Sequence, residues 1–336
     1  GLVYLSQRLR DQLGDDGSLL QLCQAASLPG AFHKVIGMPD IHSGFGLPIG
    51  GVLATDAKRG VVSAGAVGMD INCGVRLLRT AIPAKELSVS TLRALIKAIE
   101  NRVPSGIGKT TKYTAFRQAN INNVLINGAQ AIVDEGYGEP LDIEHTEERG
   151  RLLGADPSAL PKGALARTSQ LSTLGGGNHF IELGVVEKTY NPLAETAFKL
   201  AAGNLTVMIH TGSRGLGHQI CTQFSELMIK AAPALGVNLP SKGLAAVPIT
   251  SKEGRAYLSA MACAVNYAFA NRQLIAFGVR EAFIEVLGRD ALRGELSQVY
   301  DIAHNIAKFE NHFGQRLLVH RKGATRALPA GHSQNP

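Results

Sequence analysis

The chain has 336 residues, of which 45% are hydrophobic and 18% are charged, and its formal net charge is +7. This length and composition allow a sizeable core and exclude an intrinsically disordered chain. The excess of Lys and Arg favours polyanionic partners such as RNA, DNA or nucleotides, although a mildly basic soluble protein without such a partner would have the same balance.

The four cysteines indicate a reducing compartment rather than a disulfide framework. No two of them are spaced as Cys-x-x-Cys, and Cys221 and Cys263 lie in apolar stretches with helical spacing, where buried thiols are expected. We therefore expect a cytoplasmic protein. We expect no signal peptide and no membrane partner, because the longest apolar stretch, residues 256–279, is interrupted by Arg272 and two asparagines.

Apolar residues recur at helical spacing in five parts of the chain. Helices are predicted at residues 17–29, 88–102 and 123–135, after residue 217, and at 252–287. The apolar face of the second helix would consist of Leu92, Leu95, Ile96 and Ile99, and that of the fourth of Ile220, Phe224, Leu227 and Met228.

Strand signals alternate with these helices. Runs of β-branched and apolar residues predict strands at 51–54, 61–80, 180–187, 205–210 and 316–319. Because the two kinds of element are interspersed, we predict an α+β fold in which residues 1–336 form a single mixed domain.

Two loops have distinctive sequence patterns, one similar to a phosphate-binding motif and one acidic. Residues 103–123 form a polar loop with Gly-Ile-Gly-Lys-Thr-Thr at 106–111, but Val103 stands where a phosphate-binding P-loop requires glycine, so we exclude that motif. Residues 142–151 are predicted to be an acidic, solvated stretch, with His145 on the surface.

Asp70 and Cys73 lie in the run Gly-Met-Asp-Ile-Asn-Cys-Gly, which we place at a junction between a strand and a loop. Three residues apart on an irregular turn, their side chains can point at one centre. A thiolate can bridge two metal ions, and a carboxylate suits the harder of the two. A buried cysteine beside a turn aspartate fits the spacing equally well.

Three histidines lie in comparable surroundings. His179 follows Gly-Gly-Gly-Asn, His210 ends a predicted strand before Thr-Gly-Ser-Arg-Gly, and His304 lies in Asp-Ile-Ala-His-Asn. Together with Asp70 and Cys73 they form a donor set for one or two divalent metal ions, which four separate segments must converge to build. Each histidine alone is also compatible with a structural role.

Several residues near these histidines are suited to binding anions. Arg214 offers a forked donor for phosphate, and unsatisfied N–H groups are expected where the next helix begins. Asn178 and Glu182 would lie near the same ligand, while Asp40 and His42 occupy another glycine-flanked loop, as nucleotide contacts or as supports for the ligands. Basic residues also gather near the end of the chain: Arg316, His320, Arg321, Lys322 and Arg326.

Taken together, six segments of the chain resemble the RtcB-type RNA-splicing ligases, which join an RNA 3′-phosphate or 2′,3′-cyclic phosphate end to a 5′-hydroxyl end. The matching segments occur in the order of the family at 38–44, 68–76, 174–180, 208–215, 300–305 and 319–324. The resemblance implies the architecture of this family, with a central metal and nucleotide site.

The resemblance also implies cofactors and roles. It implies two Mn²⁺ ions and GTP, with Cys73 bridging both ions, His210 and His304 completing one site, and Asp70 and His179 the other. Asn178, Glu182 and Asp40 would contact the nucleotide, and Arg214 and Lys322 would serve the reaction. Guanylate would pass from GTP to a histidine and then to the RNA 3′-phosphate, before the 5′-hydroxyl expels GMP. An activating protein would be a further partner.

One block of the family is absent from the sequence. The guanylate-accepting histidine of the family belongs to a Cys-His-Gly-Ala-Gly-Arg block that follows the segment matching 319–324, and the sequence contains no such block. His320 belongs to the earlier segment and is not given that role. We therefore expect a domain that lacks its C-terminal part.

Two other functions remain open on sequence grounds. Two metal ions without the histidine nucleophile would support a phosphoesterase or cyclic phosphodiesterase. A metal-stabilised RNA-binding protein without catalysis would use the basic C-terminal residues to contact phosphates.

Overall fold

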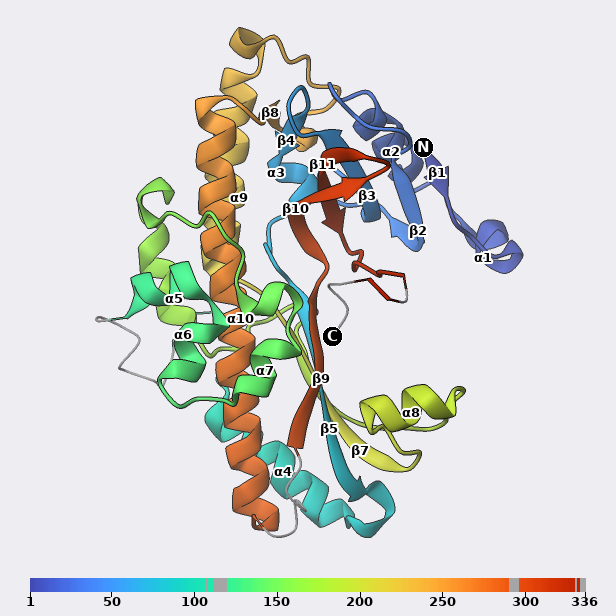
Figure 1. The fold of residues 1–336 in the computed structure, drawn as a ribbon, viewed down its shortest axis with the longest axis vertical. Coiled ribbons are helices and arrows are strands. Elements are labelled where there is room, and N and C mark those ends of the chain that lie inside the picture. Colours follow the sequence, from blue (N-terminus) through green and yellow to red (C-terminus); the bar gives the residue numbers. More distant parts are fainter. Residues whose placement is uncertain (107, 111–119, 290–295, 330, 333–336) are drawn as a thin grey trace.

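The computed structural model describes residues 1–106, 108–110, 120–289, 296–329 and 331–332, and it has mixed α and β structure, as predicted. Two larger sheets are arranged along the molecule (Figure 1). The five-stranded sheet, ordered β1-β2-β3-β11-β10, consists of Leu2–Val3, Ile36–His42, Ile49–Asp56, Gln315–Lys322 and Asn305–His312. The four-stranded sheet, ordered β6-β7-β5-β9, consists of Phe180–Val185, Asn204–Thr211, Gly74–Pro83 and Leu296–Ala303. Strands β4 (Val61–Ser63) and β8 (Ala246–Pro248) form a separate pair.

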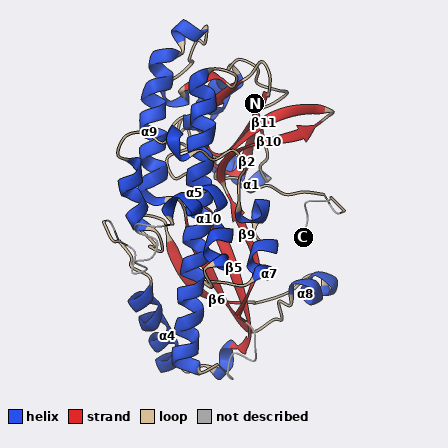
Figure 2. Cartoon of the chain, turned by 60° about the vertical axis from the view of Figure 1, so that its left-hand side comes forward, coloured by secondary structure: helices blue, strands red, loops and turns tan. Residues whose placement is uncertain are grey.

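Helices lie mainly on one side of the strands (Figures 1 and 2). They are α1 (Gln7–Gln12), α2 (Ser18–Ala26), α3 (Ala64–Val67), α4 (Val89–Arg102), α5 (Ile121–Asn127), α6 (Ala129–Asp134), α7 (Pro140–Glu144), α8 (Pro192–Phe198), α9 (Arg214–Ala231) and α10 (Lys252–Leu287). The long α10 runs beside both larger sheets and contacts α4, α5, α6 and α9. No helix in these ranges is long and apolar enough to cross a membrane.

The sequence accounts well for α4 and α10. Ser88 and Ser251 precede them, and each hydroxyl accepts a hydrogen bond from a backbone N–H of the first turn, of Thr91 and Gly254 respectively. Apolar faces of both helices then pack against the four-stranded sheet. That core contains Leu95 of α4, Ile275 and Val279 of α10, and Val207 and Ile209 of β7. Each such buried aliphatic side chain contributes about 1.5–3 kcal/mol.

Some predicted helices differ in detail. The helix expected at 123–135 is divided into α5 and α6 at Gly128, where φ is +60° and a Cβ atom would lie 2.1 Å from the carbonyl oxygen of Gly150. Ile96 and Leu227, which were assigned to apolar faces, are exposed by 49% and 43%. Both lie at the border of their helical stripe, where spacing alone does not decide burial.

The prediction of a solvated acidic stretch at 142–151 is wrong. Asp142 and Glu147 are only 2% and 1% exposed. The Asp142 carboxylate accepts hydrogen bonds from Arg280 at 2.6 Å, and Glu147 pairs with Lys308 at 2.5 Å. These partners lie more than 130 residues away in the chain, so local composition could not reveal that the acidic groups are neutralised. His145 is half-buried rather than a surface residue, and its Nδ1 donates to the Gln298 carbonyl.

Strands β9 and β10 were not predicted, nor were the short elements β1, β2, β8, α1, α3, α7 and α8. In β10 the buried Lys308 interrupts the apolar alternation, because its ammonium is paired with Glu147. The basic C-terminal residues also differ from expectation. Of these, only Arg316 is exposed, whereas Arg326 pairs with Glu147 and Glu148. Part of the predicted loop 103–123 lies outside the described residues.

Candidate metal centre and active site

The register of the four-stranded sheet brings the candidate ligands together. Gly74 of β5 pairs with Thr211 of β7 on one side and with Ala303 of β9 on the other. Cys73 immediately precedes Gly74, His210 precedes Thr211, and His304 follows Ala303. The backbone N–H of His304 donates to the Cys73 carbonyl at 2.8 Å. His304 is also the single residue between β9 and β10, so it lies where the two larger sheets meet.

The five side chains form two groups that share Cys73. One group contains Cys73, His210 and His304, the other Asp70, Cys73 and His179, and the donor atoms within each group lie within 4.8 Å of one another. Cys73 Sγ is 3.3 Å from His210 Nε2 and 3.4 Å from His179 Nε2. His179 Nε2 is 2.8 Å from Asp70 Oδ2, and His210 Nε2 is 3.3 Å from His304 Nε2.

These groups have unusual proton affinities. Burial, followed by repulsion from neighbouring imidazoles, lowers the pKa of His210 and His304, that of His304 to about 4. Burial opposes ionisation of Asp70, but the hydrogen bond and charge of His179 hold the Asp70 pKa below its ordinary value. Burial, together with the Asp70 charge, raises the pKa of the Cys73 thiol. Two imidazoles are therefore neutral, as metal ligands must be, and a bound cation would offset the burial of the thiolate.

Hydrogen bonds behind the histidines orient them as ligands. His210 Nδ1 lies 3.0 Å from the Asn178 carbonyl, which can only accept, so Nδ1 carries the proton and Nε2 presents a lone pair to Cys73 and His304. His179 Nδ1 lies 3.1 Å from the Leu174 carbonyl and 3.0 Å from the donor Arg214 Nη1, so its contacts, unlike those of His210, do not fix one tautomer. A carbonyl behind the ring and convergent nitrogens in front are typical of metal-binding histidines, so this donor set fits one or two borderline divalent ions.

The candidate centre opens into a cavity of about 530 Å³. Its lining includes Asp70, Cys73, Gly176, Gly177, Asn178, His179, Arg214, His304 and Lys322. Arg214 is the first residue of α9, and its guanidinium lies directly over Gly175, where a Cβ atom would be 2.0 Å from Arg214 Cζ. The glycine therefore allows the guanidinium to reach the site, with Nη1 3.0 Å from His179 Nδ1. Within the described part of the chain, the buried Nε of Arg214 has no hydrogen-bond partner.

Lys322, the last residue of β11, brings a second cation to the cavity. It is 7% exposed, and its ammonium donates to the Phe45 carbonyl. Burial lowers the pKa of Lys322 to about 8. The five-stranded sheet thus contributes Lys322 to a site whose candidate ligands come mainly from the four-stranded sheet.

Comparison with known proteins identifies the family. A family model described as tRNA-splicing ligase RtcB matches residues 21–336. The chain belongs to the RtcB family. It is 47% identical over 341 residues to a tRNA-splicing ligase RtcB of Thermococcus kodakarensis, with 100% of this chain and 70% of the relative covered. It is 44% identical over 340 residues to a tRNA-splicing ligase RtcB of Archaeoglobus fulgidus, with 99% of this chain and 70% of the relative covered. It is 43% identical over 323 residues to an RNA-splicing ligase RtcB of Mycobacterium tuberculosis, with 94% of this chain and 74% of the relative covered.

Family membership confirms the resemblance that the six motifs indicated, but the motif residues do not all lie at the cavity. Asp40 and Glu182 are not among the described residues that line the cavity. Both side chains are exposed, Asp40 on β2 and Glu182 on β6. On the neighbouring strands, Phe180 pairs with His210 and Glu182 pairs with Met208. Glu182 therefore lies on the same face of the sheet as His210, two residues farther along the strand. Their roles as nucleotide contacts stay predictions.

His320, although it belongs to an RtcB motif, is a structural residue. It is fully buried, its Nδ1 donates to the Leu53 carbonyl, and its Nε2 accepts the backbone N–H of Ser63. Both ring nitrogens are therefore occupied. This arrangement agrees with the expectation that His320 is not the guanylate acceptor.

Sequence reasoning missed Gln170 and was incomplete about the start of α9. Unsatisfied N–H groups were expected where this helix begins, but the N–H of Gly215 donates to Gln170 Oε1 at 2.8 Å. Gln170 itself lines the cavity, as do His218 and Asn305. Gln170 lies 45 residues before Gly215 in a segment without a recognisable motif, so no local signal could have identified it.

Proposed function

We propose that this chain is the metal- and nucleotide-binding body of a GTP- and Mn²⁺-dependent RNA ligase, which joins 3′-phosphate or 2′,3′-cyclic phosphate ends to 5′-hydroxyl ends through guanylated intermediates. The observation that carries the proposal is the pair of ligand groups sharing Cys73 at the base of a cavity with Arg214 and Lys322 in its lining. Membership of the RtcB family supports the same reaction.

The side chains have separable roles in this proposal. Asp70, Cys73, His179, His210 and His304 would hold the metal ions. Bound divalent ions would supply Lewis-acid stabilisation of charge on phosphate groups. Arg214 would orient a phosphate through its fork of N–H donors, since its Nε has no protein partner in the described residues. Lys322 would place a positive charge beside the reacting phosphates.

The preference for manganese and GTP comes from the family resemblance. Thiolate and imidazole donors alone would accept several divalent ions, including Zn²⁺. Asn178 lines the cavity and would contact the nucleotide, together with Asp40 and Glu182. A cytoplasmic location fits this chemistry, because a reducing compartment keeps the Cys73 thiol free, as all four cysteines are here. We assign the guanylate-accepting step to no residue of this chain.

A ligation assay tests the proposal. The protein is incubated with an RNA that has a 2′,3′-cyclic phosphate end and one that has a 5′-hydroxyl end, with MnCl₂ and GTP omitted in turn. In the presence of a polypeptide that carries the guanylate-accepting Cys-His-Gly-Ala-Gly-Arg block, we expect a joined product that requires both MnCl₂ and GTP, and none with Cys73→Ala. Hydrolysis of the cyclic phosphate without any need for GTP would identify a phosphoesterase instead. Salt-sensitive RNA binding without turnover would identify a binding protein.

A further inference from the structure

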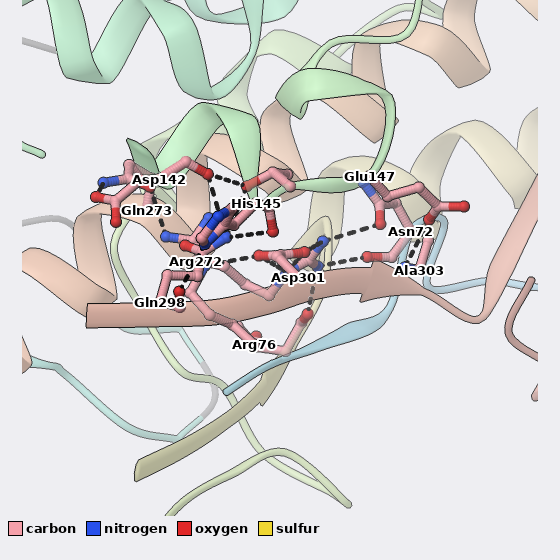
Figure 3. Close-up of polar contacts among 12 residues, drawn as sticks. Asn72, Arg76, Asp142, His145, Glu147, Arg272, Gln273, Gln298, Asp301 and Ala303 are labelled. Atoms are coloured by element: carbon pink, nitrogen blue, oxygen red, sulfur yellow. Dashed lines mark hydrogen bonds and ion pairs between the residues drawn. The ribbon is translucent and has the colours of Figure 1, made fainter. Parts of the chain in front are cut away.

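The middle of α10 carries three consecutive buried polar side chains. Asn271, Arg272 and Gln273 are all fully buried. The partners of Asn271 and Arg272 lie in segments next to the candidate ligands, whereas Gln273 donates to Asp142 of α7. Figure 3 shows Arg272 and Gln273 with their polar partners. Burying a charged group is costly unless it is fully hydrogen-bonded, so the positions of these partners decide what the segment does.

All three guanidinium nitrogens of Arg272 donate hydrogen bonds. Nε and Nη2 donate to the Asp301 carboxylate at 2.8–3.0 Å. Nη1 donates to two backbone carbonyls, of Asn72 at 2.8 Å and of Thr211 at 2.9 Å. Nη2 also reaches Asn72 Oδ1 at 3.1 Å. A planar fork with fixed donor directions thus connects three separate segments.

Each of these segments presents a candidate ligand. Asn72 lies between Asp70 and Cys73, Thr211 follows His210, and Asp301 is three residues before His304. Asn72 has φ of +55°, a left-handed conformation that is uncommon for a residue other than glycine. Arg272 donates to both the carbonyl and the side chain of Asn72. It is therefore well placed to maintain the turn from which Asp70 and Cys73 project.

We propose that Arg272 is a positioning residue that holds the segments of Asp70, Cys73, His210 and His304 in the spacing required for metal binding. The inference rests on the proposed metal-dependent function and adds a residue that touches neither metal ligand atoms nor the cavity. Residues that support ligands from behind typically change metal affinity by about 10–100-fold when mutated.

Arg76 is a matched control for Arg272. It is equally buried, and Figure 3 shows it on the other side of the Asp301 carboxylate, to which its Nε donates at 2.7 Å. Its Nη1 donates to Gln273 Oε1 and not to the backbone of Asn72 or Thr211. The two arginines therefore share burial and a carboxylate partner but differ in their contact with the ligand-bearing segments.

The test measures Mn²⁺ affinity by titration calorimetry on full-length, metal-free Arg272→Lys and Arg76→Lys, with thermal unfolding to confirm that each is folded. A lysine keeps the charge beside Asp301 but cannot reach both carbonyls. We expect the Mn²⁺ Kd to rise about 10–100-fold in Arg272→Lys and to remain close to wild type in Arg76→Lys. An unchanged Kd in Arg272→Lys, or equal increases in both variants, would overturn the inference.

A second variant covers the case in which Arg272→Lys does not fold. Asn72→Gly tolerates the left-handed conformation but removes the side-chain acceptor for Arg272 Nη2. We expect a smaller but measurable rise in the Mn²⁺ Kd, and a folded Asn72→Gly with wild-type affinity would overturn the inference. Wild-type protein that binds no Mn²⁺ would instead refute the proposed metal centre, so the two failures are distinguishable.

Discussion

Cys73 is the residue on which both candidate ligand groups depend. Its sulfur lies within 3.4 Å of the Nε2 atoms of His179 and His210, and it belongs to both groups. Asp70 and His179 contribute to one group only, as do His210 and His304 to the other. Loss of the sulfur should therefore affect both metal positions, whereas loss of any other ligand should affect mainly one.

Cys73→Ala should abolish binding of the metal pair. Elemental analysis of protein purified with MnCl₂ and then desalted measures the metal content. Cys263→Ala is the matched control, because this thiol is also fully buried but lies in α10 outside both ligand groups. Wild-type metal content in Cys73→Ala would contradict the assignment of the site.

His320 should make the fold sensitive to acid. Burial lowers the pKa of His320 to about 4, from 6.5 for the free side chain. Below pH 6.5 the unfolded chain therefore binds a proton that the folded chain excludes, and stability falls as the pH drops towards 4. His320 should account for about 2 kcal/mol of the free energy of unfolding lost between pH 8 and pH 5.

Urea unfolding of His320→Asn in EDTA at both pH values measures this contribution. Asparagine can donate to the Leu53 carbonyl and accept from Ser63 without titrating. The pH dependence should shrink by about the amount expected for His320, and His33→Asn, which alters an exposed histidine, should leave it unchanged. Identical pH dependence in His320→Asn and wild type would refute this role.

At the scale of elements, α10 is a central support that combines apolar packing with directed polar contacts. Ile275 and Val279 pack with the four-stranded sheet, while Asn266 contacts the C-terminal end of α5 and the segment at Leu152. Asn266 Nδ2 lies within 3.1 Å of the carbonyls of Leu125, Ile126 and Leu152, and its Oδ1 accepts the N–H of Leu152. The side chain of Asn266 thus supplies hydrogen bonds to backbone groups at the C-terminal end of α5 and at Leu152.

Asn266→Leu should destabilise the fold by at least about 3 kcal/mol, because several buried backbone groups lose their partner. The free energy of unfolding from urea titration measures the effect. Asn311→Leu applies the same change at an exposed position of β10 and should stay within about 0.5 kcal/mol of wild type. A small effect at Asn266 would mean that water or local rearrangement replaces these hydrogen bonds.

At the scale of the whole molecule, the candidate site joins the two larger sheets. His304 lies between β9 of one sheet and β10 of the other, and Lys322 reaches the cavity from β11. Asp142 and Glu147 add ion pairs to α10 and β10. Because the candidate metal ligands come from segments far apart in the chain, metal binding should be coupled to global folding.

Mn²⁺ should therefore stabilise the protein against unfolding. At a free concentration 100-fold above Kd, one bound ion adds about 2.7 kcal/mol, provided that the unfolded chain does not bind it. The midpoint of thermal unfolding in MnCl₂ and in EDTA measures this coupling. Cys73→Ala should show no such difference, and equal midpoints for wild type in both buffers would refute the coupling.

Local sequence determined much about this protein. Regular apolar spacing located α4 and α10, because helices that pack on a core repeat their buried positions every three or four residues. Asp, Cys and His residues in short motifs, glycine-rich for all but His304, identified the five side chains that the structure brings together. These motifs were informative because such residue types rarely occur by chance in one order along a chain, and they also identified the family.

Only the tertiary structure decided which polar residues are internal. Asp142 and Glu147 were misjudged as solvated, and Arg272 was read only as an interruption in an apolar stretch. Their neutralising partners lie far away in sequence, and a charge is buried only where folding supplies such a partner. The convergence of Cys73, His210 and His304 likewise depends on strand register, which is set by pairing across the sheet and not by the spacing within any one strand.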